Sequence, residues 1–182
     1  MAAPLVGYRC WLAEDLEGCE RSGAPAPVLR SVSFHATDWA AGRVTAVCHT
    51  WWGAWSALTH GPLPFRRQAP QPGCSCGLYA YDSLETAKIH FGGYLPQRRR
   101  QMVLGAVLVW GRVVVSEVAH DGERGSRPLL YRAEHGMVLL LRSEDPVAGR
   151  VADHYRIPLV SERYLTAKAS ELGAHLATKE VS

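Results

Sequence analysis

Two cysteines one residue apart, Cys74 and Cys76, lie in the stretch QPGCSCGLYAYDSLE, between a Pro-Gly turn and an aromatic run. If this segment is extended, both side chains point to one face with their Cα atoms about 7 Å apart, which suits two thiolates on one metal ion. Glycines on both sides of the pair permit the backbone turns of a metal clip. A disulfide between the two would be strained at this spacing.

Zinc in structural sites takes four ligands, and the nearby supply is Cys48 or His49 together with His60. We therefore predict a structural zinc site formed by four residues: Cys48, His60, Cys74 and Cys76. The competing interpretation is that these cysteines are ordinary buried thiols, since free cysteine is among the most buried residue types. A thiol catalyst would need a lowered pKa and a partnering base, and no histidine stands at a spacing that indicates one.

Three tryptophans lie within five residues: Trp51, Trp52 and Trp55. They stand at the start of a Pro-rich segment, 53–73, that we expect to be a long loop. Large aromatic side chains in a loop can form the wall of a small-molecule pocket, hold a cation or stack on a base. The alternative is that they cover a sheet. We predict a tryptophan-lined recognition pocket, to which Trp110 and Arg112 of the stretch VWGR also contribute.

The stretch YRAEHG places Arg132 and Glu134 on one face of an expected strand. A glutamate flanked by arginines can bind or activate a polar substrate, which makes these two residues the catalytic candidates if the protein is an enzyme. Such a set is more often a structural ion-pair network. The basic stretch QRRRQ, 97–101, could bind phosphate groups, but no nucleic-acid recognition motif accompanies it, so a nucleic-acid partner is disfavoured.

The elements that must position these residues alternate irregularly. Strands are expected near 28–34, over 42–52, 101–119 and 127–142, and at the stretch IPLV; helices are expected from Asp82 to Phe91, from Asp145 to Tyr155 and over 161–182. This order favours one domain, 1–182, with an α+β fold whose antiparallel sheet can close into a barrel-like shape, flanked by helices.

Four segments, GCSCGLYAYDS, VLGAVLVWGRVVV, YRAEHG and VADHYRIPLV, resemble successive blocks of an actinobacterial family of uncharacterised small proteins. That family carries a C-x-C-G-x-Y/H-A block, a block containing L-W-G-x-V and a Y-R-A-E block. The resemblance spans about Trp39 to Val160 and implies a common organisation rather than a known chemistry. The chain departs from the family between Trp51 and Arg67, and it lacks the histidine that often precedes the cysteine block, which bears on the fourth metal ligand.

Composition sets the remaining limits. Charged residues make up 20% and the apolar set 47%, with a net charge of +3, which is typical of a globular domain. The first residues lack the pattern of a signal peptide, and no apolar run is long enough to span a membrane, so we expect a cytoplasmic protein with reduced thiols. The leading hypothesis is a binding or accessory domain that takes a small molecule or a protein partner; a small enzyme and a weak nucleic-acid binder are the alternatives.

Overall fold

The structure is a computed structural model that describes residues 3–16, 26–32, 37–47, 69–70, 75–94, 96–117 and 128–180. Eight strands are described: β1 (Leu5–Leu16), β2 (Ala26–Ser31), β3 (Asp38–Trp39), β4 (Arg43–Thr45), β5 (Leu78–Tyr81), β6 (Met102–Glu117), β7 (Leu129–Arg142) and β8 (Leu159–Val160). The helices are α2 (Leu84–Gly92), α3 (Pro96–Arg99), α4 (Ala148–Tyr155) and α5 (Glu162–Glu180). Within these ranges no helix has the length and apolarity needed to cross a membrane.

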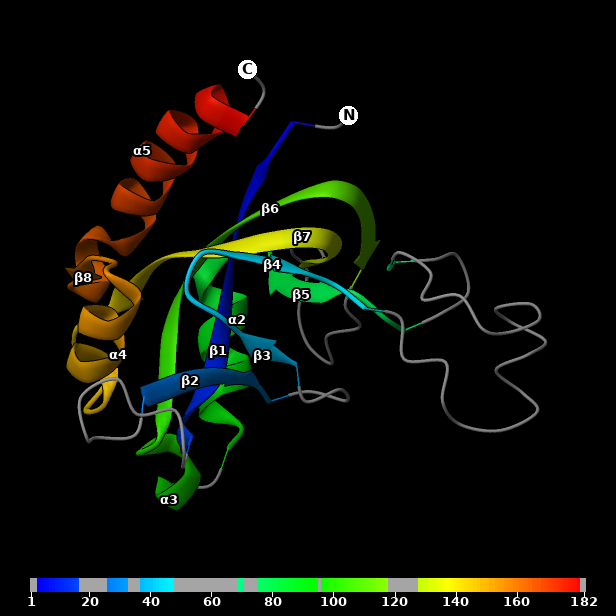
Figure 1. The fold of residues 1–182 in the computed structure, drawn as a ribbon. Coiled ribbons are helices and arrows are strands. Elements are labelled where there is room, and N and C mark those ends of the chain that lie inside the picture. Colours follow the sequence, from blue (N-terminus) through cyan, green and yellow to red (C-terminus); the bar gives the residue numbers. More distant parts are fainter. Residues whose placement is uncertain are drawn as a thin grey trace.

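The strands form one mixed, mostly antiparallel sheet, which confirms the α+β prediction. The long strands β6 and β7 pair with each other, β1 pairs with β6, and β5 pairs with β7 (Figure 1). A single pair, Tyr8 with Tyr81, joins β1 to β5 and closes this set into a ring. The ring makes the sheet curved and partly closed. Strands β2, β3, β4 and β8 extend from the ring, so the sheet is not a regular barrel.

Strand β1 lies at the centre of this arrangement, and the sequence did not predict it. Arg9, Glu14 and Asp15 interrupt its apolar pattern, yet the alternation of its side chains holds in the middle of the strand. Trp11 contributes to one hydrophobic core, whereas Tyr8 and Cys10 contribute to another. Each face of β1 therefore belongs to a different core, as the twofold side-chain period of a strand requires.

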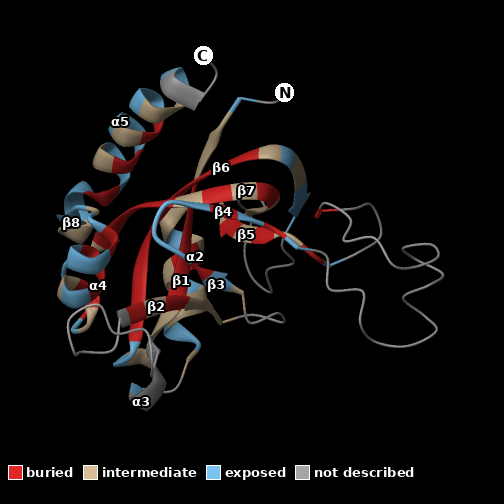
Figure 2. Ribbon diagram, viewed as in Figure 1, coloured by how far each residue is buried: buried red, intermediate tan, exposed pale blue. Residues whose placement is uncertain are grey.

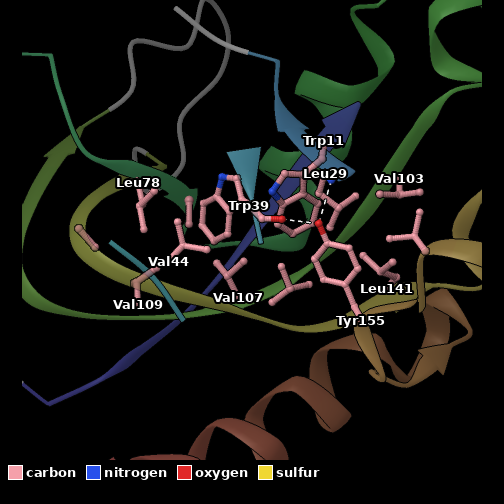
Figure 3. Packing of buried hydrophobic residues seen from close by; sticks show 14 of the residues in the cluster. Trp11, Leu29, Trp39, Val44, Leu78, Val103, Val107, Val109, Leu141 and Tyr155 are labelled. Atoms are coloured by element: carbon pink, nitrogen blue, oxygen red, sulfur yellow. Dashed lines mark hydrogen bonds between the residues drawn. The ribbon is translucent and has the colours of Figure 1, made fainter. Parts of the chain in front are cut away.

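The first core is held together by a buried tyrosine of α4. The hydroxyl of Tyr155 accepts the backbone N–H of Leu29 at 2.9 Å and donates to the backbone carbonyl of Trp39. Trp39 packs edge to face on Trp11, with ring centroids 5.7 Å apart. Figure 3 shows these side chains converging between the strands and α4. Tyr155 thus fastens β2 and β3 to the helix that covers this face.

Helices α2 and α5 cover the second core. Ala87 of α2 and Leu165 and Ala169 of α5 are completely buried against it. Figure 2 shows burial concentrated in β1, β6 and β7, while the outer turns of α4 and α5 are exposed. The apolar strand predicted at 101–119 and its partner at 127–142 are confirmed as β6 and β7.

The first N–H groups of α2 and α5 are satisfied by side chains other than those that the sequence suggested. Ser83, not Asp82, caps α2 and accepts the N–H of Thr86 at 3.2 Å. At α5 the carboxylate of Glu144 accepts the N–H of Glu162, while the hydroxyl of Ser161 donates to that same carboxylate.

Asp145 does not cap α4, which begins at Ala148. Its buried carboxylate instead accepts the N–H of Leu104 in β6 at 2.8 Å and pairs with Arg142. The aspartate thus supplies an acceptor to β6 just beyond the last β6–β7 pair, Gly105 with Leu141, and Arg142 compensates its charge.

Candidate functional site

A pocket of about 130 Å³ lies where two partner strands of β1 leave a gap. On this edge β1 pairs with β2 from Trp11 onward and with β5 at Tyr8. Arg9 and Cys10 therefore border the interval between β2 and β5. The lining residues come from β1, β5, α2 and β7 and from the residue just after β2: Arg9, Cys10, Val32, Tyr79, Tyr81, His90 and Leu130. Arg9 and Cys10 are buried and the other five are half-buried, so the pocket has a buried floor and a rim that reaches solvent.

The guanidinium of Arg9 bridges the gap. One terminal nitrogen donates to the backbone carbonyl of Tyr79 in β5 at 2.8 Å, and the other donates to the hydroxyl of Ser31 in β2 at 2.9 Å. The group also lies over the rings of Trp39 and Trp11, at 4.6 and 5.3 Å from their centroids. Its Nε is buried and has no hydrogen-bond partner among the described residues.

Cys10 and His90 form a polar pair on the opposite side of the pocket. The sulfur lies 3.5 Å from Nδ1 of His90, within the reach of a thiol–imidazole hydrogen bond. The imidazole is placed between two tyrosine rings, with centroid distances of 5.4 Å to Tyr81 and 5.3 Å to Tyr94. These rings fix the orientation of His90, which belongs to α2 and lies opposite Cys10 of β1.

The environment holds these groups in their neutral forms. Burial raises the pKa of Cys10 to about 11, although nearby Arg9 opposes that rise. Burial also raises the pKa of Tyr81 to about 12. The pKa of His90 is lowered, mainly by burial and further by the charge of Arg9. At neutral pH the pocket therefore contains a thiol, an imidazole and a phenol, all uncharged, beside one cation.

This arrangement suits binding better than nucleophilic catalysis. A catalytic cysteine needs its pKa lowered so that thiolate is present at neutral pH, and the pKa of Cys10 is displaced the other way. The neutral groups can donate or accept hydrogen bonds to a ligand, and Val32, Leu130 and the tyrosine rings offer apolar walls. Pockets that mix apolar walls with a few directed polar groups are typical of small-molecule sites.

Three of the predicted site residues gather at a bulge elsewhere in the sheet. β6 advances three residues from Trp110 to Val113 while β7 advances two, and Gly111 adopts φ +82° there. A Cβ at Gly111 would also lie 3.0 Å from a carboxylate oxygen of Glu134. The bulge therefore requires glycine both for its backbone angle and for space.

Glu134 stabilises that bulge. Its Oε2 accepts the backbone N–H of Arg112 at 3.1 Å, and its Oε1 lies 3.6 Å from Nε2 of His135. Trp110 is buried in the second core and packs near His135, with Arg43 over its ring at 5.5 Å. These contacts give Glu134 and Trp110 structural partners and favour a bracing role over a catalytic or recognition role.

Arg132 lies two residues from Glu134 on the same strand, but its contact differs. It donates to the backbone carbonyl of Cys76 at 3.4 Å, which links β7 to the segment before β5. Cys76 itself is buried and disulfide-bonded. A disulfide sulfur is not a thiolate, so Cys76 is not in the form that the predicted zinc clip requires.

The other predicted residues, Trp51, Trp52, Trp55, Cys48, His60 and Cys74, lie outside the described residues. In the described ranges, no three histidine, cysteine, aspartate or glutamate side chains gather as a metal would require. The zinc clip and the tryptophan pocket therefore stay predictions.

Sequence reasoning missed Arg9, Cys10, Tyr81 and His90. The available signal was the stretch LVGYRCWLA, in which β-branched, aromatic and other apolar residues surround one arginine. A charged residue within such a run indicates a buried cation, and a buried cation needs a local reason. His90 carries no comparable signal, because its place depends on how α2 packs.

The chain was compared with protein-family models, with curated proteins and with solved structures, and nothing matches it in any of the three.

Proposed function

We propose that this protein is a binding domain for a small organic molecule, and that the pocket between β2 and β5 is its recognition site. The observation that carries the proposal is the buried floor of Arg9 and Cys10 beneath a half-buried rim. A well-packed domain does not leave such a space in its sheet without a cost, since interiors are close-packed.

The size of the pocket limits the ligand. A cavity of roughly 150 Å³ accommodates a benzene-sized molecule, and this pocket of about 130 Å³ is comparable. The half-buried tyrosines and His90 can stack on a planar group, while Cys10 at the floor offers a weak hydrogen bond. We therefore expect one small aromatic or branched group to fill it.

The enzyme alternative based on Arg132 and Glu134 receives less support. Both side chains contact the backbone of neighbouring strands, through Cys76 and Arg112 respectively. A group that completes a sheet is poorly placed to change protonation state or partner during a reaction.

The test uses a variant that fills the pocket. Val32→Trp adds a large ring at the rim, just after β2, while Val115→Trp places the same ring on an exposed part of β6 as the matched control. Binding of phenol, followed by chemical shifts of Cys10, Tyr81 and His90, should weaken at least about tenfold in Val32→Trp and persist in Val115→Trp. Unchanged phenol binding in Val32→Trp would show that the pocket is not the recognition site.

A further inference from the structure

Arg9 is a buried cation without an anionic partner among the described residues. Its recorded contacts are a carbonyl, a hydroxyl and two indole rings, and none of these carries a formal charge. Burying a charge costs much free energy unless an opposite charge compensates it. Burial here lowers the pKa of Arg9 to about 10, which expresses that same cost.

The groups near Arg9 do not supply the missing negative charge. The groups that act on its pKa through their charge are Cys10, Tyr81 and Tyr94, and the raised pKa values of Cys10 and Tyr81 keep them neutral at physiological pH. Asp145 is close enough to affect Cys10, but its carboxylate is paired with Arg142. The lining of the pocket thus carries a net charge of about +1 near neutral pH.

The hydrogen bonds of Arg9 leave a donor for a ligand. The guanidinium has five N–H groups in a rigid planar fork, and its two hydrogen bonds engage one N–H on each terminal nitrogen. Each terminal nitrogen keeps a second N–H for a ligand in the pocket that Arg9 lines, whereas Nε is buried out of reach. An arginine N–H held in this way recognises a carboxylate oxygen through a short, charge-assisted bond. The same contact would compensate the buried charge.

We propose that the natural ligand of this pocket is a small carboxylate with an apolar body, whose carboxyl group meets Arg9. The inference rests on the proposed function, because it assigns a chemical class to the molecule that the pocket binds. The apolar walls from Val32, Leu130 and the tyrosine rings take the body of the ligand. The neutral phenol of Tyr81 can donate to the carboxylate, and the neutral thiol of Cys10 does not repel it.

The test compares two probes of one shape, benzoate and benzamide, on the full chain at low ionic strength. Benzoate should bind at least about tenfold more tightly, because only it compensates Arg9, and the shifted resonances should be those of Arg9, Tyr81 and His90. Arg9→Gln should reduce benzoate affinity to that of benzamide. Arg163→Gln, which removes an exposed arginine stacked on Tyr164 of α5, should leave both affinities unchanged.

Equal binding of the two probes to the wild-type protein would overturn the carboxylate inference and leave the pocket as a neutral binding site. Benzoate binding that survives Arg9→Gln would overturn it as well. Failure of both probes to bind would reject the carboxylate inference together with the proposed function. The wild-type comparison decides the question even if Arg9→Gln does not fold.

Discussion

Oε2 of Glu134 lies 3.1 Å from the backbone nitrogen of Arg112, at the bulge where β6 gains one residue over β7. The bulge turns this N–H away from the β7 ladder, and the buried carboxylate replaces the missing strand partner. A side chain that the sequence presents as catalytic thus completes the hydrogen bonding of a sheet.

The first prediction concerns that bond. Glu134→Ala should lower the free energy of unfolding by about 1–3 kcal/mol, because it leaves a half-buried N–H without a partner. Glu134→Gln keeps an accepting oxygen and should cost less. Urea denaturation measures both, with Glu171→Ala, which removes an exposed ion pair on α5, as a control expected within about 0.5 kcal/mol of the wild type. Equal stability of Glu134→Ala and the control would contradict the bracing role.

The second prediction concerns Tyr155. Tyr155→Phe removes a hydroxyl that accepts from Leu29 and donates to Trp39, so two buried backbone groups lose their partner. We expect a loss of about 1–3 kcal/mol in the free energy of unfolding, with an unchanged denaturant slope. Tyr164→Phe, at a 55% exposed position, is the matched control and should change little. A loss of the same size in both variants would mean that the buried hydroxyl has no special role.

The sequence predicted the long strands and missed the strand that organises them. β6 and β7 have continuous apolar runs rich in valine and leucine, and such runs identify buried strands without tertiary information. β1 mixes Arg9 and acidic residues with apolar ones, and the partners of its buried cation, which include Tyr79 and Ser31, are distant in sequence.

The candidate site could not be predicted for the same reason. Arg9 and Cys10 are neighbours on one strand, but the pocket exists because β2 and β5 end at different points along it. His90 reaches Cys10 across 80 positions of sequence through the packing of α2. Residue spacing contains none of these relationships. Trp110, Arg112 and Glu134, which the sequence offered for two different sites, lie together at the β6 bulge, and their contacts there favour a structural role.

The third prediction is a pH dependence that comes from His90. Its pKa is lowered in the folded protein, mainly by burial and also by Arg9, so the unfolded chain binds a proton more readily. Stability should therefore fall as the pH drops below about 6.5, the ordinary pKa of histidine, toward the lower folded value. Denaturation curves at pH 7.5 and 5.5 should show a smaller decrease for His90→Gln than for the wild type. The same decrease in both would assign the effect to other groups.

The fourth prediction concerns Cys76, which is disulfide-bonded in the structure, whereas the zinc clip needs it as a thiolate. A reducing environment opens a disulfide and frees its thiols, so we expect the reduced protein to be the zinc-binding form. Protein purified under reducing conditions without added metal should then contain about one equivalent of zinc, held by Cys48, His60, Cys74 and Cys76.

Oxidation should release that metal, and Cys76→Ser should abolish its binding, whereas Cys10→Ser should retain it because Cys10 lies in the β1 pocket and is a free thiol. Elemental analysis together with the intact mass after alkylation reports the metal and the redox state in one sample. Metal bound to the folded form contributes to folding free energy, so a chelator should also lower the melting temperature of the reduced protein. Less than roughly a tenth of an equivalent of zinc, with full stability in chelator, would reject the clip. Cys76 would then act as a disulfide cysteine and not as a metal ligand.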